Sequence, residues 1–181
     1  MYEMSLIACI DLNYAIGYKN ELLFHIKDDM KHFVNLTKGH TVVMGSKTWN
    51  SIPVKNRPLK DRNNIIITTK LYAYKNAENC EFMTYYDFLN KMKEYKLNDN
   101  HEKIYIIGGE AIYNLFIDYC NKIKLTVVMT TVDEYDSTLP KITIEKDFDL
   151  EDKSDIYYDE ENDLYYYFAT FIRKPETIKL I

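Results

Sequence analysis

The sequence predicts an α/β fold: a single domain with a mixed, mostly parallel central sheet, flanking helices and an antiparallel C-terminal edge. Short apolar runs alternate with helix-like segments over residues 6–119, which is typical of parallel strands joined by crossover helices. A different pattern follows, with one long strand-like run and then two more around an acidic turn. Because neither a repeat nor a linker interrupts residues 1–181, we expect one domain over the whole chain.

Four apolar runs are predicted to form buried strands, because they are short and rich in β-branched residues. They span residues 6–10, 41–44, 64–68 and 104–107. Helix-like segments lie at residues 28–37, 48–51, 86–95 and 110–119. Their alternation with the strands predicts helices on both faces of the sheet.

The C-terminal part is predicted to add antiparallel strands to the edge of this sheet. Residues 124–132 form one long strand candidate. Residues 155–158 and 164–173 are expected to pair as a hairpin across the acidic turn 159–163. The acidic stretch 145–161 is otherwise expected to be a solvated loop.

Composition and charge exclude several classes of protein. A net charge of −5 and a pI near 5.4 give no electrostatic basis for nucleic-acid binding. Cys9, Cys80 and Cys120 are too scattered for a disulfide framework, so a cytoplasmic protein with reduced thiols is expected. The first residues lack a basic region, and no apolar run approaches the roughly 20 residues of a membrane span. We therefore expect neither a signal peptide nor a membrane partner, and we expect a monomer.

The most informative residue is Asp29. On a helix that begins near Asp28, Asp29 shares an apolar stripe with Phe33 and Leu36, whereas Asp28 lies on a polar face. A carboxylate on an apolar stripe needs a partner, because burying it alone is costly. A helix N-terminal acid that only favours the helix dipole would give the same pattern. From these residues alone, a pocket acid and a dipole-stabilising acid are equally good interpretations.

Three strand ends carry small or polar residues suited to an anion. Gly108-Gly109 lies between a strand and a helix, where bare backbone amides can cradle a phosphate, although a tight turn is the favoured interpretation of a lone diglycine. Residues 44–48 (MGSKT) and 68–70 (TTK) place glycine, hydroxyls and lysine at two further strand ends. Together the three suit an extended polyphosphate ligand at the carboxyl edge of a sheet. Their spacing fits neither the full dinucleotide fingerprint nor a P-loop.

Other kinds of chemistry find no support in the sequence. The four histidines have no metal-type spacing with one another or with cysteine, so no metal site is expected. No serine lies in the G-x-S-x-G elbow of a hydrolase.

Taken in order, these segments resemble dihydrofolate reductase from about Ser5 to Pro140. The motifs that carry the resemblance are Ile16-Gly17, residues 22–33 (LLFHIKDDMKHF), 42–53 (VVMGSKTWNSIP), 55–62 (KNRPLKDR) and 106–113 (IIGGEAIY). Each motif is modest alone, but their order and spacing are specific. The resemblance implies a dihydrofolate reductase-like fold and the NADPH-dependent reduction of 7,8-dihydrofolate to 5,6,7,8-tetrahydrofolate. Hydride would go to C6 and a proton to N5.

The resemblance also implies roles on the substrate side. Asp29 would hydrogen-bond the pteridine ring, Thr126 would support Asp29 from a neighbouring strand, and Phe24 stands where the family has a tryptophan that could order water. Arg62 would grip the glutamate carboxylate of dihydrofolate, a task that suits a planar bidentate donor. The remaining residues expected to bind substrate, and antifolate inhibitors with it, are Ile7, Phe33, Ile52, Asn56, Leu59, Ile107 and Tyr113.

On the cofactor side, the resemblance implies that NADPH lies along the strand ends. The diglycine peptide would be cis, and residues 13–23 would close over the nicotinamide. The residues expected to bind the cofactor are Cys9, Ile16, Gly17, Gly45, Ser46, Lys47, Thr48, Thr68, Thr69, Lys70, Gly108, Gly109, Glu110, Ala111, Ile112 and Tyr113.

The chain departs from the family pattern in three places. Leu23-Phe24 replaces the usual Pro-Trp, which removes a rigid φ and an indole N–H. Asp61 replaces a usual glycine beside Arg62. Arginine is absent from residues 46–48 and 68–70, so a preference for NADPH would rest on lysines and hydroxyls.

Two other functions fit part of this pattern. A reductase of the riboflavin pathway shares the fold and cofactor but reduces a ribosyl-pyrimidine. Asp29, Arg62 and Trp49 argue against it, because a folate needs the pteridine anchor and the glutamate clamp. A nucleotide-binding module without turnover is the second alternative, and it would not require Asp29.

Overall fold

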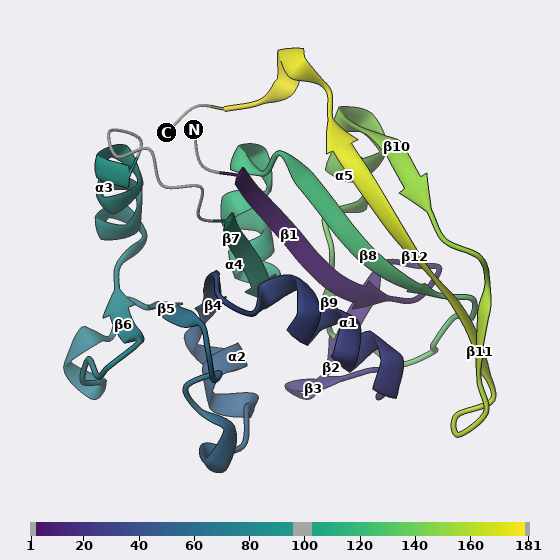
Figure 1. Cartoon of the computed structure of the whole chain (residues 1–181), viewed down its shortest axis with the longest axis horizontal. Helices are drawn as coiled ribbons and strands as arrows, with labels where there is room; N and C mark the ends of the chain where they lie inside the picture. The colour runs from purple at the N-terminus through teal and green to yellow at the C-terminus, as the bar shows by residue number, and fades with distance from the viewer. Residues whose placement is uncertain (1–2, 96–102, 180–181) are drawn as a thin grey trace.

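The main sheet has nine strands in the order β10-β12-β8-β1-β7-β4-β5-β6, with β11 paired to β12 (Figure 1). It is seen in a computed structural model that describes residues 3–95 and 103–179. The parallel strands are β1 (Glu3–Ile10), β4 (Thr41–Gly45), β5 (Asn63–Ile67), β6 (Cys80–Met83), β7 (Lys103–Gly108) and β8 (Lys122–Val128). The antiparallel edge consists of β10 (Phe148–Lys153), β11 (Tyr157–Asp159) and β12 (Leu164–Arg173). The predicted mixed, mostly parallel sheet with an antiparallel C-terminal edge is confirmed.

Helices cover both faces of this sheet, as predicted. They are α1 (Lys27–Thr37), α2 (Ser46–Ser51), α3 (Tyr85–Tyr95), α4 (Glu110–Phe116) and α5 (Lys141–Asp147), with 3-10 turns η1 (Val54–Asn56), η2 (Leu71–Ala73), η3 (Ile117–Tyr119) and η4 (Pro175–Thr177). Successive strand residues point to opposite sides of a sheet. Leu6 and Ile106 therefore pack with apolar residues of α3, α4 and α5. Ile7 and Tyr105 pack on the other face, with apolar residues of α1 and α2.

A second, three-stranded sheet was not predicted. In it β2 (Ala15–Tyr18) pairs antiparallel with both β3 (Glu21–Leu22) and β9 (Ser137–Thr138). Strands this short carry too few residues for a recognisable alternation. The sheet joins the loop after β1 to the segment after β8, which are far apart in the sequence.

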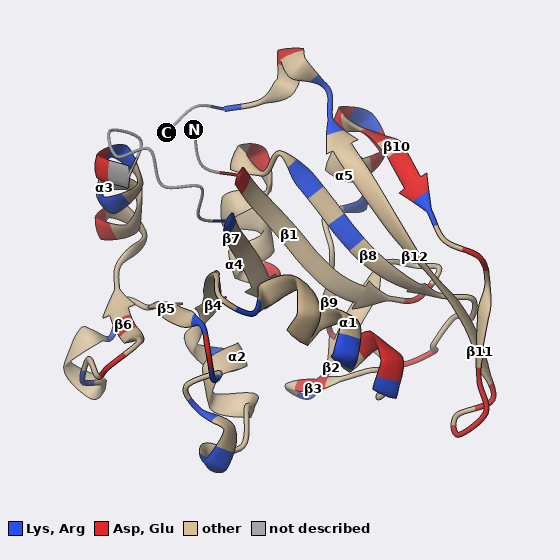
Figure 2. Ribbon diagram, in the orientation of Figure 1, with Lys and Arg blue, Asp and Glu red and all other residues tan. Residues whose placement is uncertain are grey.

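Two predictions about the C-terminal part are wrong. Residues 145–161 contain the end of α5, then β10 and β11, instead of one solvated loop. Figure 2 shows that much of the β10 ribbon has the colour of acidic residues, and every residue of that strand after Phe148 is exposed. An edge strand can pair its backbone on one side while its side chains stay in water, so acidic composition does not exclude it. The strand predicted at residues 124–132 is β8, which ends at Val128.

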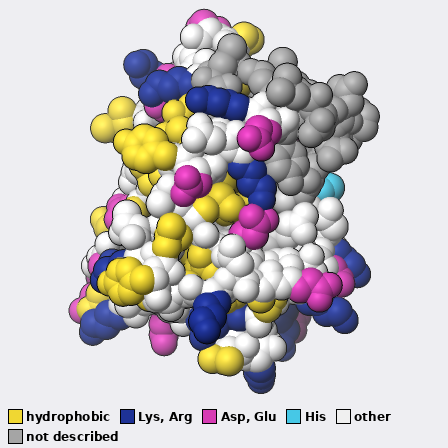
Figure 3. Space-filling model, turned by 90° about the vertical axis from the view of Figure 1, so that its left-hand side faces the viewer, with side chains coloured by type: hydrophobic (Ala, Val, Ile, Leu, Met, Phe, Trp, Pro, Cys, Tyr) yellow, Lys and Arg dark blue, Asp and Glu magenta, His cyan; other side chains and the backbone are white. Residues whose placement is uncertain are grey.

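The surface gives little further guidance to function. None of the described helices is long and apolar enough to cross a membrane. On the face seen in Figure 3, apolar, basic and acidic side chains are interspersed among the atoms that are not grey.

Candidate active site

Asp29 lies in the first turn of α1 and faces the sheet. Its Oδ1 accepts a hydrogen bond of 2.5 Å from Oγ1 of Thr126, a buried residue of β8. Asp28, the preceding residue, is exposed and pairs with Lys31 at 2.8 Å. Both acids favour the helix dipole, but only Asp29 is half-buried and held by a side chain from the sheet. The structure thus supports the pocket-acid interpretation of the apolar stripe.

Burial sets the ionisation of the groups around Asp29. It raises the pKa of the Asp29 carboxyl above its ordinary value, and the hydrogen bond from Thr126 offsets part of that rise. Burial, and then the charge of Asp29, raises the pKa of the Cys9 thiol well above its ordinary value. The pKa of Tyr113 is also raised, mainly by burial. Thiol and phenol are therefore protonated at neutral pH.

Two of these groups are fixed by the strands. Cys9 and Thr126 are register partners of the parallel pair β1–β8, which places them side by side in the sheet. The hydroxyl of Tyr113 donates a 2.9 Å hydrogen bond to the carbonyl oxygen of Ile7. The paired strands β8 and β1 therefore connect the acid on α1 with the phenol on α4.

The residues predicted as apolar walls lie in one cluster on the α1 face of the sheet. The strand residues of the cluster, Ile7 among them, are mostly buried, whereas other members keep part of their surface exposed. These partly buried members include Phe33, Trp49, Ile52, Leu59 and Ile107. The cluster is thus an incompletely covered apolar wall beside Asp29.

Arg62 lies at the end of this wall. Its guanidinium is 5.7 Å from the centre of the Phe33 ring, and it donates hydrogen bonds to the Lys60 carbonyl at 2.9 Å and to Thr37 Oγ1 at 3.2 Å. Burial lowers its pKa. Asp61 has a φ of 58°, so the chain keeps a left-handed turn where the family has glycine. Asn56 is exposed in η1.

The glycines at the strand ends are required by close approaches. The Gly108–Gly109 peptide is cis, and Gly108 has a φ of 124°. A Cβ on Gly108 would lie 3.2 Å from the Tyr113 hydroxyl, and one on Gly109 would lie 3.3 Å from Thr48 Oγ1. A Cβ on Gly45 would lie 2.9 Å from Ile112. The first turns of α2 and α4 are consequently neighbours, with bare backbone between them.

All three predicted anion-friendly segments lie at one edge of the sheet. Strands β7, β4 and β5 are adjacent and parallel, and they end at Gly108, Gly45 and Ile67. The residues that follow are Ser46, Lys47 and Thr48 after β4, and Thr68, Thr69 and Lys70 after β5. The hydroxyl of Thr68 accepts a hydrogen bond from the Lys70 N–H at 3.1 Å. Lys47, Thr69 and Lys70 are exposed and thus accessible to an anionic ligand.

Some predicted site residues have contacts that the sequence did not suggest. The carboxylate of Glu110 accepts hydrogen bonds from the N–H and hydroxyl of Thr138, at 3.3 and 3.1 Å. Phe24 is buried in an apolar cluster that includes Cys9. Ile16 and Gly17 are buried in β2. Ala111 is exposed on α4.

The sequence analysis missed Asp11, a fully buried carboxylate just beyond β1. Its oxygens accept hydrogen bonds from the backbone N–H groups of Asn13, Ala15 and Val132. An aspartate at the end of an apolar run, two residues before an asparagine, is a known turn signal and could have indicated it.

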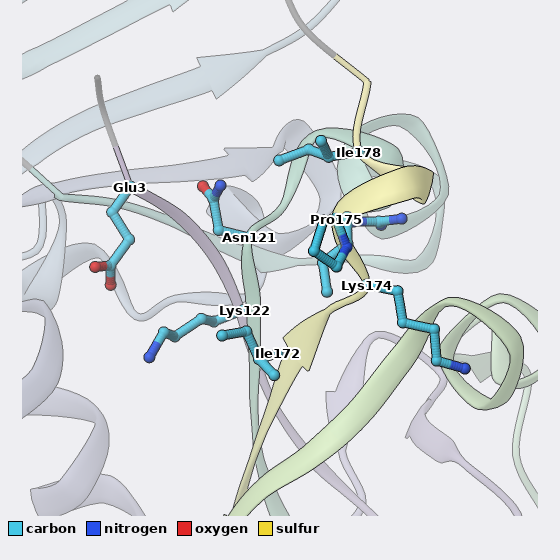
Figure 4. A pocket seen from close by; sticks show the side chains of 8 residues that line it. Glu3, Asn121, Lys122, Ile172, Lys174, Pro175 and Ile178 are labelled. Atoms are coloured by element: carbon cyan, nitrogen blue, oxygen red, sulfur yellow. The ribbon is translucent and has the colours of Figure 1, made fainter.

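A separate hollow of about 360 Å³ lies at the opposite, amino edge of the sheet, between β1, β8, β12 and η4 (Figure 4). The three cations that line it are already engaged. Lys122 pairs with Glu151 at 2.8 Å, Lys174 donates to the Lys146 carbonyl, and Arg173 donates to the Cys120 carbonyl. None of the predicted site residues lines this hollow, so the strand ends remain the candidate site.

The carboxyl edge of the sheet therefore combines a half-buried acid, an open apolar wall and a glycine-lined polar edge. Fold and site together define an α/β protein with a candidate ligand site at its strand ends.

Comparisons with known proteins identify the family. The family model for dihydrofolate reductase matches residues 3–173. A dihydrofolate reductase of Aedes albopictus is 32% identical over 191 residues, covering 97% of this chain and 100% of the relative. One of Staphylococcus haemolyticus is 31% identical over 172 residues, covering 94% and 96%. A viral dihydrofolate reductase of Saimiriine herpesvirus 2 is 32% identical over 150 residues, covering 78% and 70%. The chain belongs to the dihydrofolate reductase family of oxidoreductases.

Proposed function

We propose that this enzyme reduces 7,8-dihydrofolate to 5,6,7,8-tetrahydrofolate, with hydride from NADPH delivered to C6 and a proton to N5. Membership of the family supports dihydrofolate reduction itself. The single observation that carries the detailed proposal is the half-buried Asp29 carboxylate, held by Thr126 beside an open apolar wall.

Asp29 is the residue proposed to anchor and activate the pteridine. A carboxylate with one oxygen bonded to Thr126 retains acceptor capacity for the amino group and ring N–H of the substrate. Because burial raises its pKa, the carboxylate favours positive charge nearby and so favours a protonated ring. Charge–charge interactions of this kind are strongest in a water-poor site.

The apolar wall and Arg62 are proposed to orient the rest of the substrate. Ile7, Phe33 and Ile107 would contact the flat ring and exclude water from it. Arg62 would bind the glutamate carboxylate with its fork of N–H groups. Leu59 and Ile52 would lie along the connecting part of the substrate, with Asn56 at its polar end.

The strand ends fit an extended dinucleotide. When bound, NADPH supplies the hydride. Gly45, Gly108 and Gly109 let the strand ends pack closely against α2 and α4, since side chains there would meet Ile112, Tyr113 and Thr48. Ser46, Lys47 and Thr48, together with Thr68, Thr69 and Lys70, would hold the phosphates, including the 2′-phosphate that distinguishes NADPH from NADH. Ile16 and Gly17 of β2 are proposed to cover the nicotinamide.

NADPH oxidation, followed by absorbance with purified protein and dihydrofolate, tests this proposal directly. Asp29→Asn and an NADH reaction are the controls. Rapid oxidation that the variant loses would support both the reaction and the anchoring acid. NADPH binding without oxidation would refute the proposal, and a ribosyl-pyrimidine of the riboflavin pathway would then be tried as substrate.

A further inference from the structure

Asp11 connects two segments that are far apart in the sequence. Its Oδ1 accepts hydrogen bonds from the N–H groups of Asn13 and Ala15, both at 2.8 Å. Its Oδ2 accepts one of 3.0 Å from the N–H of Val132, 121 positions further along the chain. The side chain is 0% exposed. One carboxylate thus holds the loop after β1 and the segment after β8 together.

A carboxylate is the side chain that this position requires. Three backbone N–H groups converge on it, and an ionised carboxylate accepts at both oxygens without presenting a donor of its own. The loop between its partners contains Tyr14, whose φ of 65° is unfavourable for a non-glycine residue. The hydrogen bonds on either side of Tyr14 stabilise that turn.

The joined segments form the small sheet that borders the candidate cofactor edge. Strand β2 begins at Ala15, a partner of Asp11, and contains Ile16 and Gly17. Strand β9, which follows Val132, pairs with β2. Its Thr138 is bonded to Glu110, the residue next to the diglycine. The Ala15 end of β2 is therefore held directly by Asp11 and, through Thr138 of β9, by Glu110.

We propose that Asp11 is a positioning residue for the reaction: by joining the two segments, it holds Ile16 and Gly17 of β2 in the place needed to cover bound cofactor. This proposal rests on the proposed function, because it assumes that NADPH lies along the strand ends. Asp11 itself acts through the backbone and does not touch the reacting atoms.

The test compares Asp11→Asn with wild-type enzyme. Asparagine keeps one carbonyl oxygen for Asn13 and Ala15 but presents an N–H₂ group to the Val132 N–H, so the hydrogen bond from Val132 to residue 11 is lost. We expect the KM for NADPH to rise and the kcat to fall, each by about tenfold, since an unmet buried hydrogen bond has an effect of this order. The KM for dihydrofolate should stay within about twofold of wild type. Amide hydrogen exchange in residues 15–18 should accelerate while exchange in β1 is unchanged.

Ile144→Val, on the buried side of α5, is the matched control for a general loss of stability. It should lower the Tm without changing either KM. Equal changes of both KM values in Asp11→Asn, or wild-type exchange in residues 15–18, would overturn the proposal. If Asp11→Asn does not fold, Asp11→Ser serves the same comparison, because its short hydroxyl can reach the loop but not Val132. If the wild-type enzyme does not oxidise NADPH in the presence of dihydrofolate, the proposed function is wrong. The hydrogen-exchange result tests the role of Asp11 independently of that outcome.

Discussion

The two faces of the main sheet are packed differently. Under α3, α4 and α5 the apolar side chains are closed off from water, with Leu6, Phe88, Ile106 and Phe116 all at 0% exposure. On the α1 and α2 face, the cluster around Ile7 includes many partly exposed residues and adjoins the half-buried Asp29. The protein's own helices cover the first face. On the second face the proposed substrate would bury part of the remaining apolar surface, which would add to binding free energy.

The difference between the two faces also shows where the fold tolerates a buried charge. Both faces bury apolar side chains that stabilise the fold, but the α1 face also carries Asp29. The raised pKa of Asp29 means that the folded protein holds a carboxylate in a place that disfavours its charge. Such a group is useful for binding and costly for folding, so substitutions on the two faces should separate activity from stability.

The largest expected effect is that of Asp29→Asn on activity. Removing the anchoring charge should lower kcat/KM for dihydrofolate by about 100- to 10,000-fold, the range attributed to a positioned acid–base group. Unfolding in denaturant at neutral pH should show that the variant is no less stable than wild type, because a disfavoured buried charge has been removed. A parallel loss of stability and activity would contradict the distinction between the faces.

A truncation on the closed face should lower stability and leave the KM for dihydrofolate unchanged. Phe116→Ala removes a fully buried ring and should lower the free energy of unfolding by about 3–5 kcal/mol. The folded fraction should keep the wild-type KM for dihydrofolate, measured at low temperature where the variant remains folded. A marked rise in that KM would show that the closed face also shapes the pocket.

Phe33→Ala is the corresponding truncation on the open face. Because Phe33 is only partly buried, the loss of stability should be smaller than for Phe116→Ala, about 1–2 kcal/mol. The KM for dihydrofolate should rise about tenfold, since the ring is proposed to face the substrate. Equal stability losses for the two variants, measured by the same denaturation, would argue that both faces are closed cores.

The smallest expected effect is on the pH dependence of folding stability. A carboxyl whose pKa is raised by folding binds more proton in the folded state, so stability falls as pH rises from the ordinary aspartate pKa to the raised one, and then levels off. Asp29→Asn should abolish this contribution. Thr126→Val removes the hydrogen bond that lowers the Asp29 pKa, so the fall should extend to higher pH. Denaturation series across acidic pH would measure both, and coincident wild-type and Asp29→Asn profiles would refute the assignment.

The fold class and the direction of Asp29 could be predicted because they depend on local pattern. Apolar alternation with helix-like segments requires a parallel sheet covered on two sides, and the inner strands follow it. The helical period alone places Asp29 inward and Asp28 outward. The glycines at residues 45, 108 and 109 predicted close approaches to the backbone, and the structure contains these approaches.

The tertiary structure determined which distant residues lie next to one another. Thr126 meets Asp29 across 97 positions, and Val132 meets Asp11 across 121. The acidic strand β10 exists because β12 offers it a partner, and the small sheet exists because β9 returns to β2. These pairings are settled by strand register and by the need of buried polar groups for partners, and neither leaves a periodic trace in the sequence. The sequence by itself therefore determined the fold class and the inward acid, whereas long-range pairing determined how the site around that acid is assembled.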